Sequence, residues 1–308
     1  MGLSEIKIPG KVILSGEYAV LYGGTAVVAP AERYITVSET IPLEGELHTP
    51  IINAALEYPL DEILNFESDR GKPGVNLDSS DFFTSTNGTR KKLGIGLSAA
   101  EAVAVVELRL RRAGLNGSSL CRKTAEYAHL IHHRTQGEIG SGADIFCCAY
   151  RRPIIYKNDT GHPHVLNGGE EYDTVKVPVR MVWSGIVSDT RNMIHTYNNW
   201  LKTGGDSAQK CHSRMTRIGE RLAPLWFGPA DRKFYEIFDE YIEVMRDCAG
   251  MAGLNYWLEC HTELDNWARQ FGGRAKPSGA GGGDMIILIG DLPVEKLDRE
   301  IYKIKCQS

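Results

Sequence analysis

The glycine-rich turn KLGIGLSAAEA constrains the fold of this chain more than any other stretch, because it leads directly into a long helical pattern. Gly94 and Gly96 come just before the helical run, and the pattern closes at Gly114. Amides at a glycine turn and a helix start lack backbone partners, so they can converge on an anion. Ser98 and Glu101 also fit an S-x-x-E capping box, and a purely structural role for Ser98 therefore stays open.

The hydrophobic pattern around this turn predicts an α+β fold. Alternating apolar residues predict strands in the first third of the chain, at 5–8, 11–16, 25–31 and 32–39. Helices at 97–114 and about 119–133 follow, and then strands at 153–157 and 174–183. Helical patterns dominate 190–271, with a break near 224–229. The chain should end with a strand at 285–290 and an amphipathic helix at 293–305.

Composition and charge disfavour several classes of function. The net charge of −4 gives no basic excess, so we expect no nucleic-acid partner. No apolar stretch is long enough to cross a bilayer and no signal peptide is recognisable, which predicts a cytoplasmic protein without a membrane partner. Neither GxxxxGK[ST] nor a strand-led GxGxxG occurs. The seven cysteines form no CxxC pair, and we expect all of them to be reduced thiols.

Three separated segments change this picture when they are considered together. They are PGKVILSGEYAVLYGGTAV (9–27), KKLGIGLSAAEAVAV (91–105) and KPSGAGGGDMIIL (276–288). In order and spacing they resemble the three motifs of the GHMP kinases, a family that includes galactokinase, homoserine kinase and mevalonate kinase. The resemblance implies a two-domain fold, with a ribosomal protein S5 domain 2-like, ATP-binding half at 1–170 and a ferredoxin-like, helix-rich half at 171–308. It also implies a small-molecule kinase that uses ATP and Mg²⁺, as a monomer or a homodimer.

Local details are similar to the phosphomevalonate kinase branch of that family. They are GEYAVLYG with Tyr18, DSSDFF before KKLGIG, QGEIGSGADIFCCAY and WSGIVSDTRNMI. The resemblance therefore implies ATP-dependent phosphorylation of a small isoprenoid-pathway acid, phosphomevalonate, to the diphosphate. Mevalonate kinase, another GHMP kinase, the decarboxylase that follows in the pathway and a catalytically silent metabolite-binding protein remain alternatives. The GSGAD segment favours a kinase over the decarboxylase.

Four residues depart from the family pattern. Leu97 stands where the family has the first of two serines, and His133 stands where mevalonate kinases have a metal-binding glutamate. Asp189 and Arg191 replace residues of a Ser-Thr-Ser stretch. These departures leave the metal ligands and the acceptor open.

The resemblance implies roles for particular residues. Lys11 would neutralise charge between donor and acceptor, Asp144 would face the acceptor and pair with Lys11, and Ser98 would lie near Mg²⁺. From the residues alone, Lys11 also fits a solvated strand end and Asp144 a helix N-cap. The ATP-binding residues would be Lys92, Gly94, Ile95, Gly96, Leu97, Ser98 and Ala99. The acceptor-binding residues would be Lys11, Glu17, Tyr18, Ser141, Gly142, Asp144, Arg191, Ser278, Gly279, Ala280 and Gly281.

The acceptor decides what Asp144 has to do. A hydroxyl acceptor benefits from a general base, whereas a phosphate monoester has a second pKa of about 6 and is already ionised at neutral pH. For a phosphate acceptor, Asp144 would mainly orient Lys11. Extra cations would then be needed, and the candidates are Arg90, Lys91, Lys92 and Arg191.

Two further features have plain structural interpretations. The third glycine segment resembles a second phosphate cradle when taken alone, but the family resemblance implies that 278–283 packs closely against the active site. His129, His132 and His133 have helical spacing, and with no acidic or cysteine ligand beside them we interpret them as ordinary helix polarity and expect no metal there.

Overall fold

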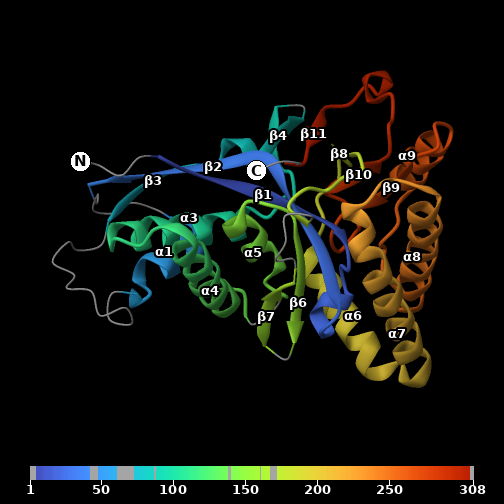
Figure 1. Cartoon of the computed structure of the whole chain (residues 1–308), viewed down its shortest axis with the longest axis horizontal. Coiled ribbons are helices and arrows are strands. Elements are labelled where there is room, and N and C mark those ends of the chain that lie inside the picture. Colours follow the sequence, from blue (N-terminus) through green and yellow to red (C-terminus); the bar gives the residue numbers. More distant parts are fainter. Residues whose placement is uncertain are drawn as a thin grey trace.

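Figure 1 shows the computed structural model of the chain, which describes residues 5–41, 48–60, 73–86, 88–137, 140–159, 161–166 and 172–305. Helices and strands are mixed, so the α+β prediction is confirmed. The N-terminal half of the chain forms one sheet with its helices, and the C-terminal half forms a second sheet with its helices. The predicted boundary between 170 and 171 lies outside the described residues.

The first sheet is antiparallel and is built around one long strand. Its strands are β1 (Ile6–Ser15), β2 (Thr25–Thr40), β3 (Gly74–Asp78), β6 (Ile154–Asp159) and β7 (His162–Val165). Strand β2 pairs with β1 along most of its length, with β6 near its start and with β3 near its end. The side chains of Ile8, Val12 and Leu14 in β1 are buried, so this strand packs into the core.

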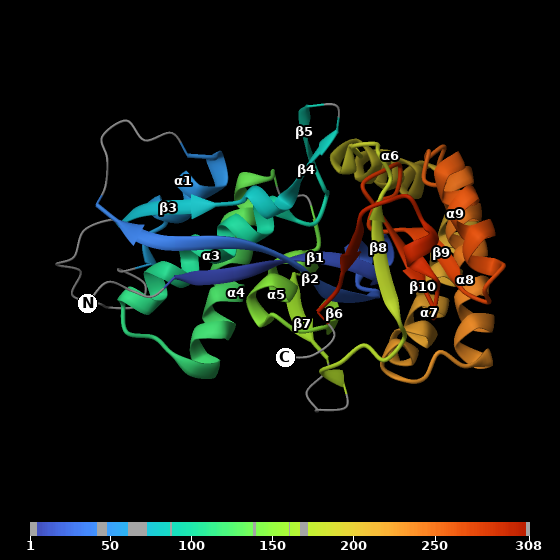
Figure 2. The same ribbon diagram turned by 90° about the horizontal axis from the view of Figure 1, so that it is seen from above.

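Four helices cover one face of this sheet, as the two ribbon views show (Figures 1 and 2). They are α1 (Pro50–Glu57), α3 (Leu97–Arg112), α4 (Gly117–Thr135) and α5 (Ala143–Tyr150). Helix α3 lies in the middle and contacts the other three helices as well as β1 and β2. Its run of Ala and Val is therefore buried on all sides, because a helix that is apolar all round needs packed neighbours all round.

The second sheet is also antiparallel and has the order β11, β8, β10, β9. Its strands are β8 (Val179–Trp183), β9 (Arg274–Pro277), β10 (Met285–Ile289) and β11 (Ile301–Lys303). The helices of this half are α6 (Thr190–Thr203), α7 (Gly205–Leu222), α8 (Arg232–Met251) and α9 (Glu259–Arg269). The predicted break near 224–229 is the short helix η4 (Ala223–Phe227).

Short elements complete the fold. Besides η4, the described residues form the 3₁₀ helices η1 (Ala19–Tyr22), η2 (Ser80–Phe82) and η5 (Val294–Lys296). A hairpin of β4 (Phe83–Thr86) and β5 (Thr89–Lys92) leads into the first glycine turn. Neither this hairpin nor α1 was expected from the sequence.

The predicted C-terminal helix at 293–305 is wrong. The segment holds η5 and then β11, where Ile301 and Tyr302 pair with Val182 and Met181 of β8. This pairing satisfies backbone groups along the edge of β8 that would otherwise need other partners. The apolar spacing of the segment fits a helix equally well, so pairing with a distant strand decides its conformation.

The expectation that every cysteine is a reduced thiol is also wrong. Cys211 of α7 and Cys248 of α8 form a disulfide with their Cα atoms 5.8 Å apart. The two helices pack side by side, and this brings together residues 37 positions apart in sequence. Cys121, Cys147, Cys148 and Cys260 are free, and Cys306 lies outside the described residues.

A buried polar network joins the two sheets. Lys276 of β9 is 0% exposed and donates to a carboxylate oxygen of Glu17 and to the carbonyl of Pro277 at 2.6 Å. Tyr241 of α8 donates to the other oxygen of Glu17 and accepts from the amide of Gly16 at 2.8 Å. The network therefore fixes the end of β1 against two elements of the C-terminal half.

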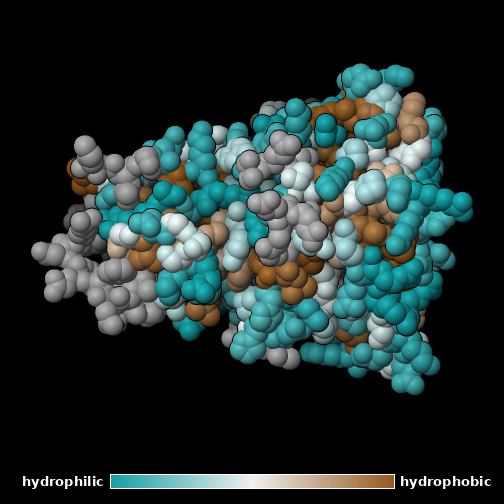
Figure 3. Space-filling view, viewed as in Figure 1, coloured by the Kyte–Doolittle hydropathy of each residue, from teal (hydrophilic) through white to brown (hydrophobic). Residues whose placement is uncertain are grey.

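The outer surface is mostly polar on the face that Figure 3 shows, with apolar side chains in smaller groups between polar ones. Within the described residues, none of the helices combines the length and the apolar character needed to span a bilayer.

Replacement of Lys276 by Met should destabilise the fold strongly, because it leaves the Glu17 carboxylate buried without its cationic partner. Breaking a buried ion pair in this way costs about 3 to 5 kcal/mol. Chemical denaturation of Lys276→Met measures the change in the free energy of unfolding. Arg221→Met is the matched control, because its ion pair with Glu240 is exposed and should contribute less than about 1 kcal/mol. Equal effects of the two substitutions would contradict this view of the network.

Candidate functional site

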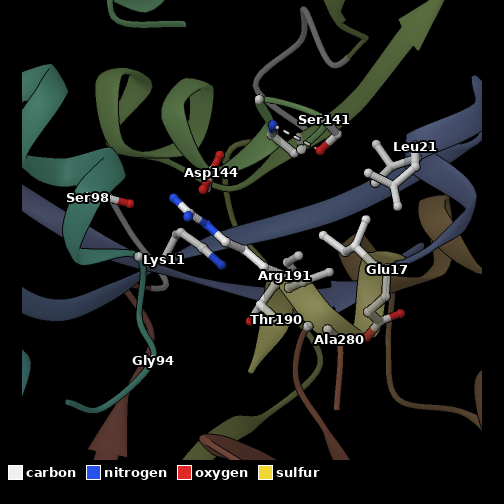
Figure 4. Close-up of a pocket in the computed structure, with 18 of the residues that line it drawn as sticks. Lys11, Glu17, Leu21, Gly94, Ser98, Ser141, Asp144, Thr190, Arg191 and Ala280 are labelled. Carbon is white, nitrogen blue, oxygen red and sulfur yellow. Dashed lines mark hydrogen bonds between the residues drawn. The ribbon is translucent and has the colours of Figure 1, made fainter. Parts of the chain in front are cut away.

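A cavity of about 520 Å³ opens where the two halves of the chain meet. Side chains from β1, η1, α3, α4, α5 and α6 line it, together with the loop between β9 and β10. Figure 4 shows Arg191 extending toward Asp144 and Ser98 in this cavity, with Lys11 beside it. A concave site with a few converging polar groups is the usual form of a small-molecule site.

Lys11 is fixed by the backbone around it. Its amide donates to the carbonyl of Ile95 at 2.8 Å, which ties β1 to the first glycine turn. A Cβ at Gly96 would lie 2.9 Å from Lys11 Cε and 3.0 Å from Cγ. Glycine at this position therefore lets the lysine side chain pass directly beside the start of α3.

Asp144 lies in the first turn of α5 and faces the same cavity. Its Oδ1 accepts from the amide of Ile145 at 2.9 Å. Burial raises the pKa of this carboxyl, but the nearby His132 and Lys11 and the backbone amides outweigh burial and lower the pKa overall. The carboxylate is therefore ionised at neutral pH. It is not the N-cap of α5, because Gly142 holds that position.

The predicted capping box at Ser98 and Glu101 is wrong. The N-cap of α3 is Gly96, with a positive φ of 84° and no side chain, so Ser98 is the second residue of the helix. The Ser98 hydroxyl forms a hydrogen bond of 3.0 Å with His132 Nε2 instead. Glu101 accepts from the Thr49 hydroxyl at 3.1 Å, and burial raises the pKa of its carboxyl. The hydroxyl of Ser98 is thus directed into the cavity.

A second cavity, of about 480 Å³, adjoins the first. The two share Gly94, Ser98, Gln136 and Arg191 among their lining residues. The rest of the second cavity is largely apolar on one side, with lining residues that include Ile51, Phe82, Ile95 and Leu97. The glycine turn therefore lies at the border between a more polar cavity and a more apolar one.

The third glycine segment, residues 278–283, lies against β1 and against Tyr256. The Ser278 hydroxyl accepts from the amide of Ile13 and donates to its carbonyl, both at 3.1 Å. A Cβ at Gly281 would lie 2.3 Å from the Tyr256 ring, and one at Gly283 would lie 2.6 Å from the carbonyl of Ile186. These glycines thus allow close approach of the backbone to its neighbours.

Tyr18 and Glu17 form the other end of the first cavity. The Tyr18 hydroxyl donates to the carbonyl of Ala280 at 2.7 Å, and its ring stacks on Tyr197 with centroids 4.3 Å apart. Glu17 lines the cavity, but both of its carboxylate oxygens are occupied by Lys276 and Tyr241. In this structure Glu17 therefore supports the wall of the cavity and presents no unpaired carboxylate to a ligand.

Arg191 connects the two halves of the chain at the border of the cavities. It lies in the first turn of α6 and donates to Gln136 Oε1 at the end of α4. Of the other predicted cations, Lys92 lines the second cavity. Arg90 lies over the Phe83 ring at 3.7 Å and lines neither cavity, and neither does Lys91.

No family model matches the sequence, and no curated protein does. Solved structures match nearly the whole chain. The Lin0012 protein from Listeria innocua is 21% identical, with a TM-score of 0.78 over 98% of this chain and 99% of that chain. Phosphomevalonate kinase from Streptococcus pneumoniae, solved with phosphomevalonate and AMPPNP, is 16% identical, with a TM-score of 0.76 over 96% and 94%. Mevalonate kinase from Methanococcus jannaschii is 16% identical, with a TM-score of 0.72 over 100% and 99%.

The chain has the GHMP kinase fold. At these identities the likeness concerns the fold, and function has to be inferred from the site.

Within the GHMP kinase fold, most of the predicted site residues come together. The first cavity is lined by Lys11, Glu17, Tyr18, Gly94, Gly96, Ser98, Ser141, Gly142, Asp144, Arg191, Ser278, Gly279 and Ala280. The second cavity adds Lys92, Ile95 and Leu97. Ala99 is buried and Gly281 packs on Tyr256, so neither lines a cavity.

Sequence reasoning missed one wall of the site. His129, His132 and His133 all line the first cavity, although we interpreted them as ordinary helix polarity. Asp284 also faces this cavity, where burial raises the pKa of its carboxyl and nearby Lys11 partly opposes that shift. The spacing of three and four between the histidines was the available signal, because it puts all of them on one face of α4. In the described part of the chain, no group of three or more His, Cys, Asp or Glu is arranged to hold a metal ion.

The resemblance to GHMP kinases implies that the first glycine turn binds ATP, and on that expectation Gly94→Ala should weaken nucleotide binding by about tenfold or more. Gly94 has a φ of +74°, and a Cβ there would lie 2.2 Å from Asp284 Cγ, so the turn would have to move. Calorimetry with AMPPNP and Mg²⁺ measures the change in Kd. Gly88→Ala is the control, because Gly88 has a φ of +72° but open space around it. Equal losses in both variants would show that backbone strain alone causes the effect.

The resemblance also implies that the third glycine segment lies on the acceptor side, and on that expectation Gly281→Val should impair acceptor use more than nucleotide binding. The new side chain would displace Tyr256, and with it the loop that carries Ala280 and holds Tyr18. Steady-state kinetics should show a higher acceptor KM and a lower kcat with little change in the Kd for AMPPNP. Gly253→Val serves as the control, because its φ of +68° is similar and no atom lies near its Cβ position. A selective loss of nucleotide affinity would contradict this assignment.

Proposed function

We propose that the protein transfers the γ-phosphoryl group of ATP to a small isoprenoid-pathway acid, and that phosphomevalonate is the acceptor. One observation carries the proposal. Lys11, Ser98, Asp144 and Arg191 line a single cavity that continues past the glycine turn into a second cavity. Phosphoryl transfer depends on positioning and on charge around the moving group, and these four side chains supply both.

The second cavity is the proposed nucleoside site. Its apolar wall of Ile51, Phe82 and Leu97 suits a planar base, and the amides at the start of α3 suit the phosphates next to it. Leu97, which departs from the family serine, would thus contact the nucleoside.

A magnesium ion fits the residues at the border of the cavities. The Ser98 hydroxyl faces the same cavity as the ionised Asp144 carboxylate, and Mg²⁺ takes many of its ligands from phosphates and water. Ser98 would be the residue that holds it. When bound with ATP, the ion would neutralise phosphate charge and orient the γ-phosphoryl group. The residue at the family glutamate position, His133, would not be needed as a ligand.

The first cavity suits an acid with an apolar body and an anionic end. Val20, Leu21 and Ile194 form an apolar wall, while Lys11 and Arg191 bring positive charge to the other side. Glu17, the carboxylate that could accept hydrogen bonds from a sugar hydroxyl, is already paired. These features favour a phosphorylated aliphatic acid over a sugar.

For such an acceptor, Asp144 would orient Lys11 between the reacting groups. A phosphate monoester is already ionised at neutral pH and needs no base. Mevalonate is a second candidate acceptor, because an ionised Asp144 could also accept the proton of a hydroxyl group.

An ADP-release assay over mevalonate, phosphomevalonate, diphosphomevalonate, homoserine and simple sugars tests the acceptor. We expect ATP- and Mg²⁺-dependent turnover to be highest with phosphomevalonate, without release of CO₂. Turnover of another acid or a sugar with no activity on phosphomevalonate would refute the acceptor assignment. Release of CO₂ with ADP from diphosphomevalonate would identify a decarboxylase instead.

Lys11→Met and Asp144→Ala should each lower kcat/KM by more than about tenfold, which corresponds to ~1.4 kcal/mol in barrier height. Arg191→Gln should raise the KM for phosphomevalonate more than that for mevalonate, because it removes a cation from the acceptor phosphate. Steady-state kinetics with both acids measures these changes. Lys202→Gln, at the exposed end of the same helix α6, is the control. Turnover within tenfold of the parent for the first two variants would rule out their assigned roles.

A further inference from the structure

His132 occupies the point where three helix ends meet. It lies in the last turn of α4, whereas Ser98 lies in the first turn of α3 and Asp144 in the first turn of α5. All three side chains line the first cavity. None of the three motifs of the sequence contains His132, and its role cannot be inferred from them.

The histidine forms a hydrogen bond at the first glycine turn. Its Nε2 lies 3.0 Å from Ser98 Oγ, across 34 positions of sequence. Because Gly96 is the N-cap of α3, the Ser98 hydroxyl is not needed to cap that helix. The hydrogen bond to His132 instead fixes which way the hydroxyl points. A hydroxyl on an isolated serine could adopt three rotamers, and this contact selects one of them.

His132 lines the same cavity as the carboxylate of Asp144. Burial raises the pKa of the Asp144 carboxyl, whereas nearby His132 and Lys11 oppose burial and lower that pKa. The imidazole therefore shares one cavity with Ser98 and with Asp144. The structure shows no other side chain among its described residues that hydrogen-bonds with Ser98.

Its two neighbours on α4 are placed differently. A Cβ at Gly142 would lie 2.3 Å from His129 Nδ1, so the His129 ring packs against the start of α5. His133 packs against His129 with ring centroids 5.7 Å apart. Among the hydrogen bonds of the described residues, neither of them joins Ser98, so the side-chain contact with the first glycine turn is made by His132.

We propose that His132 is a positioning residue, which holds the Ser98 hydroxyl toward the nucleotide phosphates. The proposal rests on the proposed function, because it assumes that a nucleotide occupies the glycine turn. The proposed role depends on the hydrogen bond at Nε2. A residue that does not ionise can therefore replace His132 if its side chain reaches the same point.

Replacing His132 by Gln and by Asn distinguishes this hydrogen-bonding role from a requirement for histidine itself or for a side chain of similar size. The side-chain amide of Gln reaches about as far as Nε2 of His, whereas that of Asn reaches only as far as Nδ1. His132→Gln should therefore keep the Kd for AMPPNP with Mg²⁺ within about threefold of the parent. His132→Asn and His132→Ala should raise that Kd about tenfold and lower kcat by more. Calorimetry and steady-state kinetics measure these values. Arg134→Gln, an exposed change on the same helix, is the control.

A double-mutant cycle tests whether His132 acts through Ser98. If it does, His132→Asn should add little to the loss of AMPPNP affinity already caused by Ser98→Ala. Additive losses, or a Gln variant as weak as the Asn variant, would overturn the proposal. Thermal unfolding of each variant identifies any that fail to fold, and the Gln and Asn pair then carries the comparison because both are polar and of similar shape.

Failure of the acceptor assignment would look different from failure of this proposal. A parent protein that binds AMPPNP but phosphorylates none of the acids would refute the acceptor alone, and the binding series would still test His132. A parent protein that binds no AMPPNP would refute both.

Discussion

The ammonium group of Lys276 is the constraint on which the geometry of the site depends. It is completely buried, and a charge in the interior has to be paired. Glu17 supplies the opposite charge, and Tyr241 holds the second oxygen of that carboxylate. Glu17 follows the end of β1, so the pairing fixes the strand that carries Lys11 against the C-terminal sheet. The cavity between the two halves can keep its shape because this link is internal and shielded from water.

Small residues then bring the backbone segments into contact around that link. Gly96 lets the Lys11 side chain pass the start of α3, and Gly281 lets the third glycine segment reach Tyr256. The starts of α3 and α5 both meet the cavity, and the partial positive charge of a helix N-terminus favours bound anions. A polar, anion-favouring site thus follows from close packing as much as from charged side chains.

Much of this was predictable because it is local. Neighbouring residues decide the glycine turn, the helix behind it and the strands near Lys11. The structure confirms the predicted strands and helices of the N-terminal half. It joins the predicted strands at 5–16 into β1 and those at 25–39 into β2. Three motifs in order and spacing were enough to predict the GHMP kinase fold.

The predictions that failed concern features that depend on contacts between distant parts of the chain. The last segment became β11 because the edge of β8 was available, and no local pattern reports that. Cys211 and Cys248 meet only because α7 and α8 pack together. The capping prediction failed by two residues, since the positive φ of Gly96 moved the N-cap away from Ser98. His132 was overlooked for the same reason, because its partners belong to other helices.

The contact between Arg191 and Gln136 has a consequence for the order of events at the site. Both residues line both cavities, so a ligand that takes over the hydrogen bond of either side chain would separate the pair. The first ligand to do so bears the free-energy cost of the separation, and a second ligand then binds without it. Donor and acceptor would in that case strengthen each other's binding, and by linkage the enhancement is equal in both directions.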